Sequence, residues 1–125
     1  MNYLHSNLTG EIINCAMEVH KSLGPGLLES AYEECLYYEL VQRGFNVTKQ
    51  QPLPLLYKDV KLDCGYRLDL FVEKEIIIEL KAVDALNDLH MAQIMTYMKL
   101  TERRLGLLIN FNVKYLKSGI KRVIL

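Results

Sequence analysis

Three charged side chains interrupt two otherwise apolar segments in the middle of the chain. Asp69 lies within YRLDLFV, and Glu79 and Lys81 lie within IIIELKAV. If both segments are strands, Glu79 and Lys81 share one face of theirs. Neighbouring carboxylates repel each other, and a divalent cation or an ammonium group offsets that repulsion. The pattern therefore indicates a centre of oxygen ligands for a cation, with a lysine beside it.

The two segments should pair as a β-hairpin, because only the short charged link EKE separates them. If Val72 pairs with Ile76, the antiparallel register puts Asp69 directly opposite Glu79, with Cβ atoms roughly 5 Å apart. Alternation along the strand also predicts that Asp69 shares a face with Phe71. A hairpin keeps such a pair of acids only if something nearby balances their charge.

An alternative is that the three charged residues form salt bridges on a solvent-facing sheet surface. The many Ile, Leu and Val residues of both segments argue for strands that are buried on both faces. Burial favours the functional interpretation.

Glu29 is a further candidate because it shares a stripe of the second predicted helix with Tyr32 and Leu36. That stripe faces the core. The alternative is an ordinary acid in the first helical turn, where it complements the helix macrodipole.

Gln93 and Tyr97 lie four residues apart on the third predicted helix, with His90 one turn earlier. They form a polar seam, which is either part of a site or a solvated helix face. His20 lies near the end of the first predicted helix, where an imidazole commonly makes a favourable dipole contact.

Hydrophobic periodicity and turn signals predict the elements that must position these residues. Glycines end the first two helices, and prolines restrict the segment after Val47 to an edge or irregular strand. The expected order is helix 9–23, helix 27–43, a strand from 45, a turn at 57–60, strands 66–72 and 76–83, helix 87–100, and strands 105–111 and 120–125. This order predicts an α/β or α+β fold with a mixed central sheet flanked by helices.

Composition limits the class of protein. The 125 residues are 50% hydrophobic and 24% charged, which suits one globular domain, residues 1–125, and excludes fibrous or disordered classes. Three cysteines without a CxxC pair predict buried free thiols in a reducing compartment. No signal peptide or membrane-length apolar run is recognised, so we expect a cytoplasmic protein that does not bind a membrane.

The formal charge of zero conceals an uneven distribution. Residues 1–98 hold eight Lys and Arg against fourteen Asp and Glu, whereas residues 99–125 hold seven against one. Lys99, Arg103 and Arg104 are therefore candidate contacts to phosphates on the approach to a site. The alternative is a set of solvated element ends.

Four short motifs carry a family resemblance. GLLESAY at 26–32 matches a GxxExxY signature, GYRLD at 65–69 resembles a GxxxD segment, and ELK at 79–81 resembles an ExK segment. Gln93 to Tyr97 is similar to the QxxxY element of RecB-like nucleases. Four motifs in this order are far more specific than any single one. The chain thus resembles the GxxExxY family of the PD-(D/E)XK nuclease superfamily.

The resemblance implies a restriction-endonuclease-like core of helix, three antiparallel strands, helix and strand. It implies that Glu29, Asp69, Glu79 and the backbone carbonyl of Leu80 hold Mg²⁺ or Mn²⁺, hard cations that prefer oxygen ligands. Lys81 would orient the attacking water or stabilise charge in the transition state.

The resemblance also implies supporting roles for residues around that centre. Gln93 and Tyr97 would hold Lys81 or a phosphate in place, and Tyr32 belongs to the same surroundings. His20 could be an additional metal ligand, as the first-helix histidine is in RecB-like relatives.

We therefore expect a metal-dependent nuclease that cleaves DNA or RNA. The main alternative is a non-catalytic nucleic-acid-binding or protein-binding module, which the small size of the chain suggests; a small-molecule hydrolase is a third possibility. We expect a homodimer, for which the Leu- and Tyr-rich segment LYYEL at 36–40 offers a surface.

Overall fold

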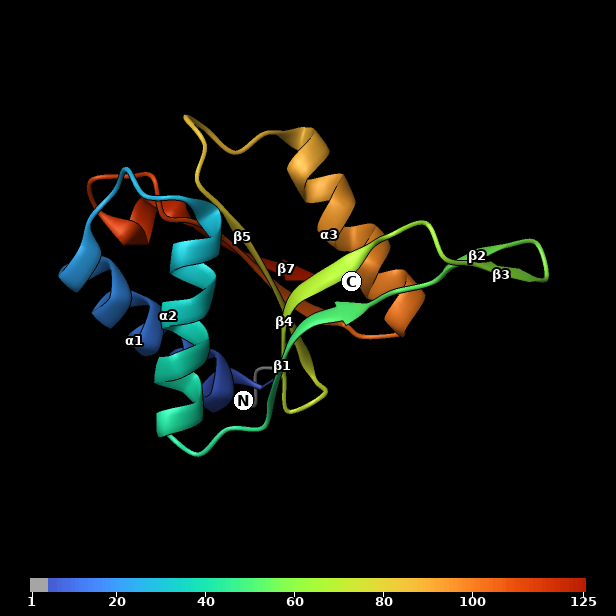
Figure 1. Ribbon diagram of the computed structural model, residues 1–125, viewed down its shortest axis with the longest axis horizontal. Coiled ribbons are helices and arrows are strands. Elements are labelled where there is room, and N and C mark those ends of the chain that lie inside the picture. Colours follow the sequence, from blue (N-terminus) through green and yellow to red (C-terminus); the bar gives the residue numbers. More distant parts are fainter. Residues whose placement is uncertain (1–4) are drawn as a thin grey trace.

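The computed structural model describes residues 5–125 and has three layers (Figure 1). Helices α1 (Ser6–Leu23) and α2 (Glu29–Gln42) cover one face of a central sheet, and helix α3 (Asp88–Thr101) covers the other. The predicted class, a mixed sheet flanked by helices, is confirmed. No helix in the described part of the chain is long and apolar enough to cross a bilayer.

The central sheet has five strands in the order β1-β4-β5-β6-β7. Strands β5 and β6 are parallel and every other neighbouring pair is antiparallel. A parallel pair needs a crossover connection, and α3 supplies it between β5 and β6. The bounds are β1 (Val47–Pro52), β4 (Arg67–Val72), β5 (Ile76–Lys81), β6 (Leu105–Asn110) and β7 (Ile120–Ile124), with a short 3₁₀ turn at Leu116–Gly119.

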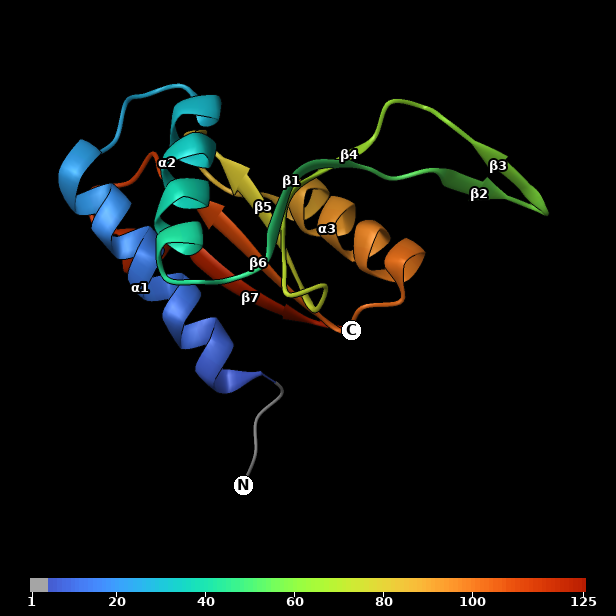
Figure 2. The same cartoon turned by 60° about the horizontal axis from the view of Figure 1, so that its bottom comes forward.

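Two short strands form a separate arm. β2 (Leu55–Tyr57) and β3 (Val60–Leu62) pair with each other around the predicted turn and project from the body of the molecule (Figure 2). Proline explains why this region leaves the central sheet, since Pro52 ends the edge strand β1 and cannot donate to a ladder.

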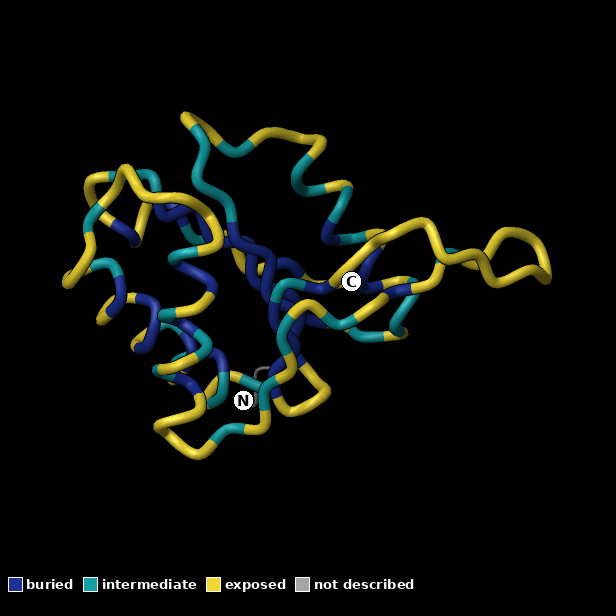
Figure 3. The backbone as a smooth tube through the Cα atoms, viewed as in Figure 1, coloured by how far each residue is buried: buried dark blue, intermediate teal, exposed yellow. Residues whose placement is uncertain are grey.

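The sheet separates two apolar cores. Ile76, Ile78 and Leu80 of β5 pack toward α1 and α2, whereas Ile77 packs toward α3. All of β6 is buried, so the dark tube at the centre of Figure 3 marks strands covered on both faces. Burial on both faces, predicted from the Ile, Leu and Val content of this region, is confirmed for β5.

Most predicted elements are confirmed to within a few residues, including the β4–β5 hairpin, and the side chain of Asn87 caps the start of α3. Two surface predictions are right only in part. All three cysteines are free and Cys15 is buried, but Cys35 is half-buried and Cys64 exposed. In LYYEL the leucines Leu36 and Leu40 are fully buried, because they form the core-facing stripe of α2, whereas Tyr38 is 60% exposed; a homodimer through this segment stays a prediction.

Gly119 sets a packing limit that tests the fold. A Cβ at this position would lie 2.2 Å from the backbone oxygen of Asn110. Gly119→Ala should therefore lower the free energy of unfolding by about 1–3 kcal/mol or more, the usual cost of overpacking. Urea unfolding followed by circular dichroism measures this.

Gly10→Ala is the matched control. Nothing lies within 4 Å of its added Cβ, and Gly10 is inside α1, so the change should stabilise the protein by about 0.5–1 kcal/mol. Equal stabilities for the two variants would contradict the packing described here.

Candidate active site

The centre of the site is a place where the sheet opens between β4 and β5. The strands pair from Val72↔Ile76 to Leu70↔Ile78, which is the predicted register, and Asp69 and Glu79 are the next positions along it. At these two positions side-chain carboxylates accept the backbone N–H hydrogen bonds that carbonyl groups would accept in a regular ladder. Asp69 N–H donates to Glu79 Oε1 at 3.3 Å, and Leu80 N–H donates to Asp69 Oδ2 at 2.9 Å.

Asp69 also lies at a break in the pairing between β4 and its other neighbour, β1. The β1–β4 register skips Gln50, opposite Asp69, and Gln50 adopts a left-handed backbone with φ 55°. The Gln50 amide donates to Glu33 at 2.5 Å and to Asp69 at 3.3 Å. Hydrogen bonds from this neutral amide favour the ionised form of the carboxylates but supply no positive charge.

This opening corrects the prediction that strict alternation continues through β4. Leu70 and Val72 face α1 and α2, and Phe71 faces α3, as alternation requires. Leu68, however, also packs on the α3 side, so the alternation shifts by one at Asp69. Asp69 is thereby turned toward α2, where it lines a hollow with Glu29 and Glu33, and does not share the face of Phe71.

Burial and the nearby charge of Asp69 raise the pKa values of two carboxyl groups at the site, Glu79 and Glu29. Glu79 is only 3% exposed, and its burial, followed by the nearby charge of Asp69, raises its pKa to about 9. Glu29 is largely exposed at the rim, yet partial desolvation and then Asp69 still raise its pKa. Lys81 acts in the opposite direction on both groups without balancing them.

Tyr32 explains the spacing of the first motif. Its hydroxyl donates to the Gly24 carbonyl at 2.6 Å and accepts from Leu27 N–H at 3.1 Å. Its ring stacks on Phe111 with centroids 4.5 Å apart. Tyr32 therefore fixes the loop before α2, and so fixes Glu29 as the first residue of that helix.

A hollow of about 580 Å³ opens beside these acids. It is lined by Leu28, Glu29, Ser30, Glu33, Gln50 and Asp69. Glu29 and Asp69 are the two lining residues that the sequence predicted, and among those it missed are Glu33 and Gln50, which are hydrogen-bonded to each other. Glu33 could have been found, because it follows Glu29 by one helical turn on the same face. Gln50 carries no comparable signal, because its place depends on the left-handed backbone of β1.

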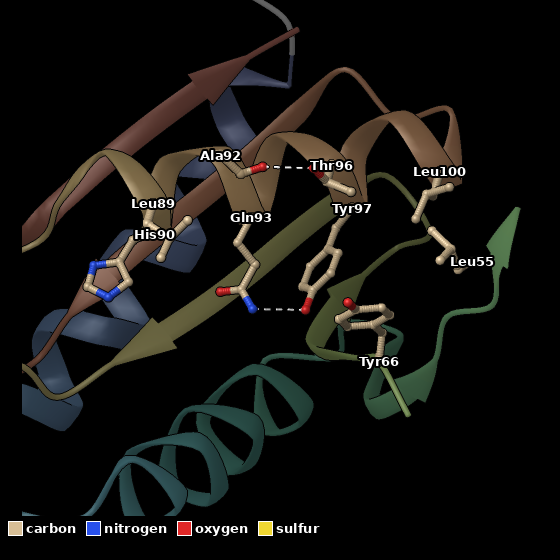
Figure 4. A pocket seen from close by; sticks show the side chains of 9 residues that line it. All are labelled: Leu55, Tyr66, Leu89, His90, Ala92, Gln93, Thr96, Tyr97 and Leu100. Atoms are coloured by element: carbon tan, nitrogen blue, oxygen red, sulfur yellow. Dashed lines mark hydrogen bonds between the residues drawn. The ribbon is translucent and has the colours of Figure 1, made fainter. Parts of the chain in front are cut away.

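Lys81 is held by a chain of hydrogen bonds from α3. Its Nζ donates to Gln93 Oε1 at 3.0 Å, and Gln93 Nε2 donates to the Tyr97 hydroxyl at 3.0 Å. Figure 4 shows the second of these bonds. Burial, then the charge of Glu79, raises the pKa of Tyr97, so its hydroxyl remains protonated at neutral pH.

The structure places the remaining candidates elsewhere. His20 Nε2 lies 2.7 Å from the Val113 carbonyl oxygen, and His90 closes the capping box at the start of α3. Arg103 Nε donates to the Lys74 carbonyl at 2.7 Å, in the hairpin turn at the far end of β5 from Lys81. Neither Arg103 nor its neighbour Arg104 is brought to the carboxylates; their contact with nucleic acid, like that of Lys99 on the last turn of α3, stays a prediction.

A comparison with protein families provides the decisive observation. The family model of the PD-(D/E)XK nuclease superfamily matches residues 6–123, nearly the whole chain. The chain belongs to the PD-(D/E)XK nuclease superfamily. Searches of curated proteins and of solved structures gave no significant match. Membership of this superfamily supports a nuclease-like function.

PD-(D/E)XK nucleases generally use divalent metal ions. Within residues 5–125, no three His, Cys, Asp or Glu side chains converge closely enough to hold an ion as they stand. The donor set still suits a hard cation, because Glu79 is hydrogen-bonded to the backbone of Asp69 at the opening of the sheet and Glu29 lines the same hollow as Asp69. Burial and the nearby charge of Asp69 raise the pKa values of Glu29 and Glu79, and a bound cation would favour the ionised form of both.

Glu79 makes stability depend on pH in a defined direction. In the unfolded chain its carboxyl ionises near 4.5, whereas in the folded protein it stays protonated up to about pH 9. Stability in chelator should therefore fall as pH rises between these values. Glu79→Gln removes this effect, so its free energy of unfolding relative to wild type should increase by up to about 1.4 kcal/mol per pH unit.

Urea unfolding of both proteins in EDTA from pH 5 to pH 8 measures the difference. Glu18→Gln, an exposed substitution on α1, is the control and should follow the wild-type pH dependence. A difference between Glu79→Gln and wild type that does not vary with pH would contradict the buried, protonated state of Glu79.

Proposed function

We propose that this PD-(D/E)XK protein is a metal-dependent nuclease that hydrolyses phosphodiester bonds of DNA or RNA. The observation that carries the proposal is that Asp69 of β4 faces Glu79 of β5 inside the sheet. Lys81 follows Glu79 by two residues on β5. Chemistry on a phosphodiester needs both a centre for cations and a positive group beside it.

The proposed ligands are Glu29, Asp69, Glu79 and the backbone carbonyl of Leu80. When bound, Mg²⁺ or Mn²⁺ would lower the pKa of a water molecule and withdraw charge from the phosphate. Glu29 stands at the N-terminus of α2, where the helix dipole supports a carboxylate. The half-buried Asp69 and the buried Glu79 are held by hydrogen bonds to the backbone of β4 and β5.

Lys81 has the second role in the proposal. Its ammonium group, held by Gln93, would orient the attacking water or stabilise negative charge on the phosphate in the transition state. Gln93 and Tyr97 act as positioning residues, because their hydrogen bonds restrict where the ammonium group can lie. A long flexible lysine gains most from such restriction.

The finer assignment to the GxxExxY family, with a QxxxY element like that of RecB-like nucleases, is part of the same proposal. Its support is that four of the motif residues have a defined position or contact around the site. Tyr32 sets the start of α2, Glu29 faces the hollow, and Gln93 and Tyr97 form the chain to Lys81.

A cleavage assay tests the proposal. Purified protein should cut at least one of single-stranded DNA, duplex DNA, single-stranded RNA and duplex RNA when Mg²⁺ or Mn²⁺ is present, and EDTA should abolish cutting. Lys81→Ala should lower the rate at least about 100-fold, a size typical for loss of one charge-stabilising group. Lys21→Ala, on the exposed side of α1, is the matched control and should cut at the wild-type rate.

Failure to cut any of the four substrates, or equal cleavage rates for wild type and Lys81→Ala, would contradict the nuclease proposal. Binding of nucleic acid without cutting would instead support a non-catalytic binding module on the same fold.

A further inference from the structure

An apolar groove runs along the exposed side of α3, on the opposite face of the sheet from α1 and α2. It has a volume of about 400 Å³. Its lining is mostly aliphatic and aromatic, with a few polar side chains from α3 (Figure 4). The residues are Leu55, Tyr66, Leu89, His90, Ala92, Gln93, Thr96, Tyr97 and Leu100.

Tyr66 gives the groove an exposed aromatic wall. Its side chain faces α3 from the segment just before β4, and it is 42% exposed. The ring meets Tyr97 edge-on, with centroids 6.0 Å apart. The Tyr66 backbone is fixed by Leu53 N–H, which donates to its carbonyl at 2.9 Å. The groove therefore has a pre-positioned aromatic face that a planar ligand can contact.

The groove is continuous with the hydrogen-bond chain that holds Lys81. Gln93 and Tyr97 line the groove and also belong to that chain. Because the Tyr97 oxygen accepts a hydrogen bond from Gln93, its own O–H can donate to a ligand in the groove. Only Gln93 separates the Tyr97 hydroxyl in the groove from Lys81, where the phosphate is proposed to bind.

We propose that the groove binds an unpaired nucleobase of the substrate strand, next to the phosphate that is cleaved. This inference rests on the proposed function and adds the substrate class, a single-stranded or locally unpaired strand. An aromatic face with aliphatic walls suits any base, and stacking of this kind is tolerant of sequence. A base inside a duplex is stacked on both sides and cannot enter such a groove without unpairing.

Binding is the direct test, measured by fluorescence anisotropy of a labelled single-stranded oligonucleotide in EDTA, so that nothing is cut. Tyr66→Ala should weaken binding about 5- to 140-fold, the range for stacking of one base on an aromatic side chain. Tyr66→Phe keeps the ring and should bind like wild type. Tyr38→Ala is the matched control, since Tyr38 is 60% exposed on α2, on the other face of the sheet.

A second variant guards against loss of folding in Tyr66→Ala. Ala92 is exposed on α3 and lines the groove, so Ala92→Leu fills the groove from a helical position that tolerates leucine. It should weaken single-strand binding while leaving the melting temperature near that of wild type. Affinity for fully paired duplex should change little in either variant.

The outcomes separate this inference from the proposed function. Cutting by wild type with unchanged binding by Tyr66→Ala and Ala92→Leu would overturn the inference alone. Tyr66-dependent binding without cutting would overturn the nuclease proposal and would leave the groove as the base site of a non-catalytic nucleic-acid-binding module. A protein that is dimeric in sedimentation and becomes monomeric in Ala92→Leu would show that a second copy fills the groove, and would also overturn the inference.

Discussion

The site depends on the electrostatic repulsion between two carboxylates that face each other in the middle of a β-sheet. Asp69 and Glu79 occupy facing positions where two strands would otherwise exchange backbone hydrogen bonds, and the acids take those bonds themselves. Burial and mutual repulsion favour the neutral form of Glu79. Such an arrangement costs stability in the isolated protein and is expected where a charged ligand completes the site.

The rest of the fold keeps the two carboxylates close together. Two apolar cores fix β5 from both faces, so the strand cannot move Glu79 into water without exposing its isoleucines. The Tyr32 hydroxyl ties down the loop that presents Glu29, and α3 lays Gln93 against Lys81 as it crosses from β5 to β6. The acids and the lysine are thus supported by elements from three separate parts of the chain.

Much of this arrangement could be predicted from residue spacing. The link between β4 and β5 is short, so the register and the facing of Asp69 and Glu79 followed from counting. Gln93 and Tyr97 followed from helical periodicity. The turn between β2 and β3 was predicted, but their pairing as a separate arm was not. The shift of alternation at Asp69 and the left-handed Gln50 could not be predicted, because both depend on backbone geometry that side-chain patterns do not record. The position of Arg103 at the far end of the sheet also required the three-dimensional path of the chain.

The central claim is that a divalent cation completes the carboxylate cluster, and the number of protons released on Mn²⁺ binding tests it most directly. Calorimetric titration at pH 7 in buffers of different ionisation enthalpy gives this number. Because Glu79 is protonated in the metal-free protein, binding should release a proton, and the release should diminish as the pH approaches about 9. No binding, or binding without proton release at pH 7, would contradict this account.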